Sequence, residues 1–322
     1  MKFTKMHGTG NDYIYLNLFP GKNDSVEYEM DEDGSLITVD GKPIAEVAIK
    51  MSDRHFGIGS DGIIAIAPSD VADVRMIMFN ADGSEGAMCG NGIRCVAKFS
   101  YDHKLLGEKV LYGSDSEEYE EIDVETASGV KHLKLTITGG KCTYVEVNMG
   151  KPAFLPEEIP VDSWLIGPGK NALPDIPSDY IVDGVLVVGE QDYRVTCVSM
   201  GNPHCVVFTT GIDELDLEKI GPLFENHAAF PDRINTEFVE VINDHTLRMR
   251  VWERGSGETI SCGTGTCAVT VASVLNGYTK RDTEVEIQIR GGKLFDTYLS
   301  NGDVMMKGPA TEVFSGEYEI KE

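Results

Sequence analysis

The feature that most constrains the fold of this chain is a segment that occurs twice. The run MCGNGIRCVAKF at Met88–Phe99 is similar to SCGTGTCAVTVA at Ser261–Ala272, so the Cys-Gly pairs that begin at Cys89 and Cys262 lie about half of the 322-residue chain apart. Self-similarity at one large spacing is the signature of a repeated structural unit. We therefore expect a duplicated domain, which also agrees with the usual domain size of roughly 150 residues.

Further matches occur in the same order in both halves. They are GNDYIYL from Gly10 with GNPHCVVF from Gly201, DRHFGIGSDGIIAI from Asp53 with DRINTEFVEVI from Asp232, and Asn80 with Glu253, each nine residues before its Cys-Gly pair. Any one of these matches could arise by chance, but chance does not readily preserve their order. The sequence therefore predicts a duplication.

Local patterns place these motifs on expected elements. Short runs that alternate or are rich in β-branched residues predict strands at 74–79, 193–200, 204–208, 236–242 and 247–252. Helical patterns occur at 43–51, 91–105, 215–227 and 264–276, and Gly277 ends the last of these. Each half thus has one central helix that begins at its Cys-Gly pair. The acidic stretch Gly113–Glu121 has no counterpart and is expected to be a solvated loop.

Seven cysteines, without a secretory signal, indicate reduced thiols rather than a disulfide framework. Their spacing lacks the C-x₂-C pairs of a structural zinc site, so no metal is expected. Five of them are interpreted as small core residues: Cys95, Cys142, Cys197, Cys205 and Cys267.

Cys89 and Cys262 differ because each is expected at a helix start. Glycines there allow close approach of a ligand, and the helix N-terminus attracts an anion, either a substrate carboxylate or the thiolate itself. We expect this position to lower the thiol pKa. Duplication would bring two such groups to one cavity, where a thiolate removes a proton from one face of a carbon and a thiol delivers one to the other. Fixed N–H donors would stabilise the carbanion.

Three polar residues are further candidates. His204 and Glu253 are interpreted as groups that orient and deprotonate the thiols, or alternatively as a satisfied strand-end histidine and a salt-bridged glutamate. Arg254 could hold a carboxylate with two hydrogen bonds, or form a surface ion pair with Glu253.

Bulk properties exclude other classes of protein. A formal net charge of −25 would repel nucleic acid. The N-terminus lacks a signal peptide and no run of 18 apolar residues occurs, so a cytoplasmic protein without a membrane segment is expected. The glycine-rich segments HGTGND and HFGIGSDG lack both dinucleotide and P-loop spacing, which argues against a nucleotide site.

Across nearly its whole length the sequence resembles the diaminopimelate epimerase family. The motifs that carry the resemblance are KMHGTGNDY, DRHFGIGSDG, FNADGSEGAMCGNGIRC, GNPHCVVF, DRINTEFV and ERGSGETISCGTGTCA. The Cys-Gly-Asn-Gly form favours this family over proline and hydroxyproline racemases, whose first motif usually has His after Cys-Gly. The resemblance implies cofactor-independent interconversion of LL-2,6-diaminoheptanedioate and its meso form, on the bacterial route to lysine and peptidoglycan.

The resemblance also implies roles for individual residues. Cys89 and Cys262 match the acid–base pair of the family, and His204 and Glu253 match the groups that assist it. The substrate-binding residues of the family match Asn11, Asn80, Gly90, Asn91, Asn202, Asn235, Glu253, Arg254, Gly263 and Thr264. One position departs, since many members have a substrate-contacting Gln where Gly62 stands.

The fold implied by the resemblance is mixed α/β, with two pseudo-symmetric domains that are each a curved mixed sheet around a central helix, and with the site in the cleft between them. Its domains would span 1–148 plus 309–322 and 149–308, because a final strand near Glu312–Ile320 returns to the first domain. The family is expected to act as a homodimer on a small diamino-dicarboxylate. A racemase or isomerase of the same fold and a non-catalytic amino-acid-binding protein are the alternatives.

Overall fold

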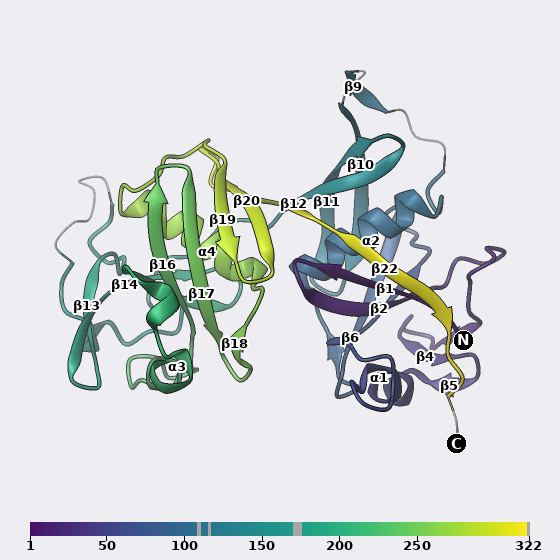
Figure 1. Cartoon of the computed structure of the whole chain (residues 1–322), viewed down its shortest axis with the longest axis horizontal. Helices are drawn as coiled ribbons and strands as arrows, with labels where there is room; N and C mark the ends of the chain where they lie inside the picture. The colour runs from purple at the N-terminus through teal and green to yellow at the C-terminus, as the bar shows by residue number, and fades with distance from the viewer. Residues whose placement is uncertain (108–110, 115–116, 170–175, 321–322) are drawn as a thin grey trace. The chain divides into compact units, whose positions relative to one another are not determined.

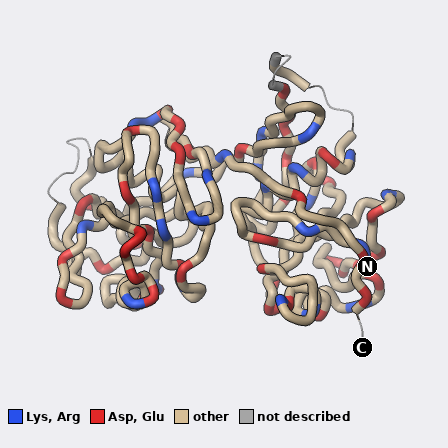
Figure 2. The backbone as a smooth tube through the Cα atoms, in the orientation of Figure 1, with Lys and Arg blue, Asp and Glu red and all other residues tan. Residues whose placement is uncertain are grey.

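The computed structural model describes residues 1–107, 111–114, 117–169 and 176–320, which form two compact units (Figure 1). Unit 1 comprises Met1–Val147 and Gly308–Glu322, and unit 2 comprises Asn148–Lys307. These limits lie one residue from the boundaries expected from the sequence. Acidic side chains are spread over both units with fewer basic ones among them, as the excess of 53 acidic over 28 basic residues requires (Figure 2).

Unit 1 is built on one long mixed sheet. Its neighbouring strands are, in order, β22 (Thr311–Glu317), β1 (Lys2–Gly8), β2 (Asn11–Asn17), β6 (Gly62–Ala67), β7 (Val74–Asn80), β10 (Glu117–Thr126), β11 (Gly129–Thr138) and β12 (Lys141–Asn148). The pairs β2–β6 and β7–β10 are parallel, and the others are antiparallel. The C-terminal strand β22 lies beside β1, which confirms the predicted return of the chain to the first domain.

Unit 2 repeats this order and these directions. Its strands are β13 (Gly184–Val188), β14 (Gln191–Ser199), β15 (Pro203–Phe208), β16 (Asn235–Asn243), β17 (Thr246–Glu253), β19 (Val285–Ile289), β20 (Gly292–Tyr298) and β21 (Val304–Pro309). Here β15–β16 and β17–β19 are the parallel pairs, at the same places in the order. The shared topology confirms the duplication.

Each sheet curves around one central helix. These helices are α2 (Gly90–Asp102) and α4 (Gly263–Leu275), both 13 residues long, with Cys89 and Cys262 as their N-cap residues in extended conformations. Contacts of α2 reach from β22 at one end of its sheet to β11, the strand before the other end. Both helices are buried on nearly every side, and a helix covered all round lies inside a core rather than on its surface. The predicted helix starts at the Cys-Gly pairs are confirmed.

A second helix covers the outer face of each sheet. In unit 1 this is α1 (Ile44–Ser52), and in unit 2 it is α3 (Leu217–Glu225). The strand β6, GIIAIA, is buried throughout because α1 packs on one face of the sheet and α2 on the other. Strands covered on both faces read as continuous apolar runs. Alternate residues of β2, β6, β15 and β16 thus point to the central helix.

The smaller elements complete the chain. They are β3 (Tyr28–Met30), β4 (Leu36–Val39) and β5 (Lys42–Pro43) in a separate sheet, the short strands β8 (Glu85–Gly86), β9 (Tyr112–Ser114) and β18 (Gly257–Thr259), and the 3-10 turns η1 (Ser163–Leu165) and η2 (Ile212–Glu214).

The acidic stretch Gly113–Glu121 differs from its prediction. It was expected to be a loop, but Tyr112–Ser114 and the start of β10 pair as an antiparallel hairpin, and the hydroxyl of Tyr112 donates to Glu121 across it at 2.7 Å. Residues 115–116 lie outside the described ranges. Cross-strand pairing therefore outweighs the turn-rich composition of this segment.

Candidate functional site

In unit 1, Cys89 lies at the entrance of α2. Its sulfur accepts from the backbone N–H of Gly92 at 3.3 Å, and the N–H of Asn91 and the hydroxyl of Tyr13 on β2 act to lower its pKa. The thiol itself donates to Oδ1 of Asn11 at 3.1 Å. The helix start and the beginning of β2, far apart in the sequence, thus meet at this sulfur, and Cys89 stays partly exposed.

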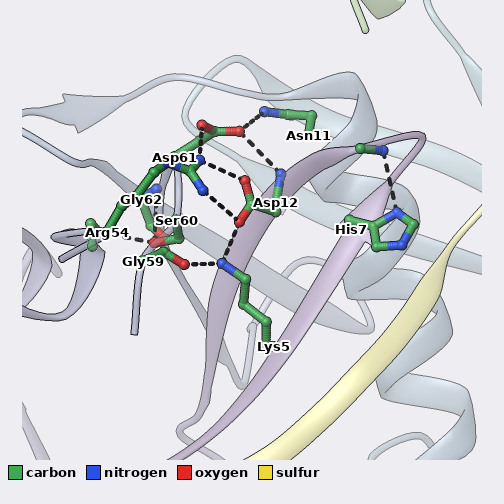
Figure 3. Close-up of polar contacts among 11 residues, drawn as sticks. Lys5, His7, Asn11, Asp12, Arg54, Gly59, Ser60, Asp61 and Gly62 are labelled. Atoms are coloured by element: carbon green, nitrogen blue, oxygen red, sulfur yellow. Dashed lines mark hydrogen bonds and ion pairs between the residues drawn. The ribbon is translucent and has the colours of Figure 1, made fainter. Parts of the chain in front are cut away.

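The orientation of the Asn11 amide is fixed from its other side. Asp61 accepts from Nδ2 of Asn11 at 2.6 Å and from the backbone N–H of Asp12 at 3.1 Å (Figure 3). Arg54 bridges Asp12 and Asp61 at 2.8 and 2.9 Å, and Lys5 adds a further ion pair to Asp12. An ionised carboxylate only accepts, so Asp61 takes the NH₂ group of Asn11 and leaves its oxygen for Cys89.

Arg94 ties the first turn of α2 to the rest of unit 1. It is fully buried and donates to Oδ1 of Asn91 at 2.9 Å, to the carbonyl of Gly90 at 3.2 Å and to the carbonyl of Pro309 at 3.4 Å. The side chain of Asn91 is therefore directed into the protein. What Gly90 and Asn91 present at the helix entrance is their backbone, as expected for an anion-binding helix start.

The expected lowering of the thiol pKa is wrong for Cys89. Burial raises the pKa of this thiol above its ordinary value, while the N–H groups of Gly92 and Asn91, the Tyr13 hydroxyl and the charge of Arg94 act to lower it. Desolvation of the anion outweighs the helix N-terminus here. The thiol form is favoured in the ligand-free protein.

In unit 2, Cys262 lies between carboxylates. The thiol is 5% exposed, and the charge of Glu253 at the end of β17 acts to raise its pKa. Glu253 accepts a short hydrogen bond from the hydroxyl of Thr259. Thr264 lies 3.7 Å from the sulfur. Glu253 therefore lies near enough to act on the sulfur it was expected to assist, and no ion pair with Arg254 occurs within the described ranges.

A fully buried pair lies behind this cysteine. Nδ1 of His204 on β15 is 2.7 Å from Oε1 of Glu237 on β16, and both side chains have zero exposure. Nε2 of the same imidazole is 2.9 Å from Oδ1 of Asn202, whose NH₂ group donates to the Thr264 hydroxyl at 3.3 Å. A chain of hydrogen bonds thus connects β16 to the start of α4.

The loop after β17 is held by two buried groups. Asn235 accepts from the backbone N–H of Arg254 at 2.9 Å and donates to the carbonyl of Pro203 at 2.9 Å. Glu225 on α3 accepts from the indole of Trp252 at 2.7 Å and from another backbone N–H of this loop at 2.8 Å. The guanidinium of Arg254 is bonded through Nη1 to the carbonyl of Asp232.

The pKa of Cys262 also contradicts the expectation from its helix position. Burial raises it well above the ordinary value, and the charges of Glu253 and Glu237 raise it further, while Thr264 and the N–H of Gly265 act against this. Burial likewise raises the pKa of Glu253. The two cysteines thus share a backbone position but differ in electrostatic surroundings.

The remaining predicted site residues lie at the end of a strand or the start of a helix. Asn80 ends β7 opposite Gly62 of β6, and its amide donates to Ser84 at 3.0 Å. Gly263 is the first residue of α4. At Gly62, an added Cβ would lie 2.1 Å from the carbonyl oxygen of Phe79, so the side chain of a glutamine has no room at this position.

We predict that Gly62→Ala lowers the free energy of unfolding by about 1–3 kcal/mol, because the methyl group would overlap a backbone atom that belongs to the neighbouring strand. Urea denaturation measures the change as a shift of the midpoint. Gly107→Ala is the matched control, since a Cβ there meets nothing within 4 Å. Equal midpoints for the two variants would contradict the prediction.

The five cysteines predicted to be core residues are buried as expected. They are Cys95, Cys142, Cys197, Cys205 and Cys267, each at most 1% exposed. Burial raises the pKa of Cys95 to about 11 and that of Cys142 to about 12, so neither is a base near neutral pH.

Comparison with known proteins identifies the family. The family model described as diaminopimelate epimerase matches residues 3–155 and 196–313, which include every residue described above around Cys89 and around Cys262. The chain belongs to the diaminopimelate epimerase family.

Curated members of this family match over the full length. The chain is 50% identical to the diaminopimelate epimerase of Agathobacter rectalis, covering 99% of this chain and 100% of that protein. It is 48% identical to that of Acetivibrio thermocellus, with 100% of both covered.

Solved structures of other proteins share the fold at low identity. A phenazine biosynthesis protein of the PhzF family from Bacillus anthracis matches with a TM-score of 0.62 and 15% identity, covering 99% of each chain. A hydroxyproline epimerase from Agrobacterium vitis matches with a TM-score of 0.58 and 13% identity, covering 98% of this chain and 91% of that one. None of the helices in the described ranges combines the length and apolarity that a membrane crossing requires.

The sequence analysis missed four residues near the two cysteines, which are Tyr13, Asp61, Arg94 and Glu237. A residue-by-residue reading of GNDYIYL against GNPHCVVF would have paired Tyr13 with His204. The run NTEFVEVI contains both Glu237 and Glu240, and its alternation does not show which of them faces inward. No comparable signal marked Asp61 or Arg94, because their roles depend on partners from other elements.

Proposed function

We propose that this protein interconverts LL-2,6-diaminoheptanedioate and its meso form, with Cys89 and Cys262 as the acid–base pair. The membership of the family supports the reaction, and the single observation that carries the mechanism is the equivalence of the two N-cap cysteines. Both stand before a 13-residue central helix, with φ and ψ of −131° and 118° at Cys89 and −130° and 104° at Cys262.

In this proposal the two sulfurs act on opposite faces of one carbon. One cysteine as thiolate removes the proton, and the other as thiol delivers a proton from the opposite side, so the configuration inverts. The α-proton of an amino acid is much less acidic than a thiol, so the carbanion needs stabilisation. The N–H groups of Gly90, Asn91, Gly263 and Thr264 at two helix starts would supply it by binding the α-carboxylate.

Other polar groups around the two cysteines would hold the rest of the substrate. Asn11, Asn80, Asn202 and Asn235 offer amides, and Arg254 offers a guanidinium that is only partly engaged through Nη1. Glu253 would assist Cys262 as its hydrogen-bond acceptor, and His204 would act through Asn202 and Thr264. The expected homodimer and cytoplasmic location stay predictions.

Incubation of the purified protein with the LL isomer in deuterated water tests the reaction. We expect meso product that carries deuterium at one α-carbon, formed without added pyridoxal phosphate, because the proton delivered by the second cysteine exchanges with solvent. Proton NMR of the product measures the label. Proline and hydroxyproline serve as control substrates, and their conversion in place of diaminoheptanedioate would point to a racemase of the same fold. Unlabelled product would refute the two-base mechanism.

A further inference from the structure

Glu237 and Ile64 occupy the same place in the two units. In the β6–β7 pair, Ile64 lies opposite the residue two before Asn80. In the β16–β17 pair, Glu237 lies opposite the residue two before Glu253. Asn80 and Glu253 are equivalent residues of the duplication, so the register makes Ile64 and Glu237 equivalent as well.

Both residues touch the third position of the central helix. A Cβ placed on Gly92 would lie 2.6 Å from Cδ1 of Ile64. A Cβ placed on Gly265 would lie 2.8 Å from Oε1 of Glu237 and 3.1 Å from Sγ of Cys262. The carboxylate and the sulfur therefore flank the same point. Because an isoleucine fills this place in unit 1, the fold itself does not require a carboxylate there.

The carboxylate of Glu237 lies in an unfavourable place. It is fully buried, and only Oε1 is bonded, to Nδ1 of His204; Oε2 has no hydrogen-bond partner within the described ranges. A buried ion pair with an unused oxygen generally contributes little to stability compared with apolar side chains of similar size. Stability therefore does not account for Glu237, which indicates a part in the chemistry of the neighbouring sulfur.

The groups that face Cys262 are acidic. Glu253 approaches from β17 and Glu237 from β16, with His204 on β15 behind Glu237. From its own helix, the Thr264 hydroxyl and the N–H of Gly265 act in the opposite direction. A negative charge beside a sulfur disfavours its thiolate.

The groups that face Cys89 are different in kind. Tyr13 takes the place of His204, Ile64 that of Glu237 and Asn80 that of Glu253, so no carboxylate occupies the corresponding positions. The Tyr13 hydroxyl and the charge of Arg94 both act to lower the pKa of Cys89, while the oxygen of Asn11 accepts from the thiol. This surrounding favours a thiolate more than that of Cys262 does.

We propose that Glu237 is a positioning residue that makes the surroundings of Cys262 unequal to those of Cys89. It holds the His204 imidazole toward Asn202, and it keeps the proton on Cys262 in the ligand-free protein, so that Cys89 is the cysteine that ionises first. The inference rests on the proposed function in that it assigns starting protonation states to the acid–base pair.

Alkylation of the ligand-free protein tests this assignment without substrate. The thiolate is the species that reacts with iodoacetamide, so the pH dependence of alkylation reports ionisation, and peptide mass spectrometry separates the two cysteines. The accessibility of a sulfur to iodoacetamide changes the maximal alkylation rate at high pH but not the pH at which half of that rate is reached. The two cysteines are therefore compared by these midpoints. We expect the midpoint of Cys89 at lower pH than that of Cys262, and the reverse order or equal midpoints would overturn the proposal.

The variant Glu237→Gln removes the charge and keeps the shape and the acceptor for His204. At a pH below the wild-type midpoint of Cys262, we expect Cys262 to alkylate about ten times faster in this variant than in the wild-type protein. The pH dependence of Cys89 alkylation should not change. Glu237→Asp keeps the charge and should stay close to wild type. Glu120→Gln is the matched control, a buried glutamate of unit 1 that is 5% exposed, and should move neither profile.

Failure of this inference and failure of the proposed function are distinguishable. A folded Glu237→Gln protein, verified by circular dichroism, in which Cys262 alkylates as in wild type overturns the role of Glu237 whatever the protein catalyses. The wild-type comparison of midpoints also decides when the variant does not fold. In an active enzyme, Glu237→Gln should in addition shift the pH profile of kcat/KM, which a purely structural role would not move.

Discussion

Replacing Cys89 with alanine is expected to lower kcat for the LL-to-meso conversion by about 10²–10⁴-fold, and Cys262→Ala is expected to do the same. Inversion needs a base on one face of the carbon and an acid on the other, and each substitution removes one of them. No other thiol can substitute, because the five remaining cysteines are buried in the cores of the two units. A coupled assay of the meso product measures the loss.

Each single variant should nevertheless retain one partial reaction. With one thiol left, a proton can be removed from and returned to the same face, so the α-hydrogen of one stereoisomer exchanges with deuterated water without inversion. Cys89→Ala and Cys262→Ala should exchange opposite stereoisomers, which assigns a face to each cysteine. Cys95→Ala is the control in unit 1 and should keep near wild-type turnover. A Cys89→Ala enzyme that still inverts configuration at the wild-type rate would exclude the two-base mechanism.

Arg94→Leu is expected to lower the free energy of unfolding by about 3–5 kcal/mol. Arg94 is fully buried, and its guanidinium joins the first turn of α2 to Pro309 on the returning C-terminal segment. Leucine would leave the carbonyls of Gly90 and Pro309 and the oxygen of Asn91 without this donor, in a site closed to water. Urea denaturation measures the loss.

Two further variants separate the parts of this effect. Arg94→Lys keeps the positive charge and loses the planar fork, so it should recover only part of the stability. Lys293→Leu removes a charge from an exposed pair with Glu286 and should change stability by less than about 1 kcal/mol. If Arg94→Leu were as stable as Lys293→Leu, the proposed role of the buried guanidinium would be wrong.

The sequence predicted the helices and strands closely because their signals are local. The four expected helices begin within two residues of their observed starts, and the capping cysteine and following glycine of α2 and α4 could be read directly. The prediction of a loop for the acidic stretch after Tyr112 was wrong. The pairing of this stretch with β10 depends on residues across a hairpin rather than on its own composition.

The site was predicted in part. His204, Glu253, Asn202 and Thr264 were expected and do lie around Cys262. Glu237 was missed because a strand pattern shows which residues alternate but not which face meets the central helix. The departure at Gly62 was seen in the sequence, but its physical reason was not. The carbonyl of Phe79 leaves no room for a glutamine side chain there, which only the register of β6 and β7 reveals.

The sequence by itself determined that the chain is a duplication with one N-capping cysteine in each half, because repeats, glycines and helix starts are properties of short segments. Only the tertiary structure decided the ionisation of those cysteines. The pKa of a thiol depends on burial and on charges that arrive from other strands, and here burial outweighs the helix N-terminus at both sulfurs. The same folding that repeats the backbone brings Tyr13 and Ile64 to one cysteine and His204 and Glu237 to the other, so matching positions carry unequal chemistry.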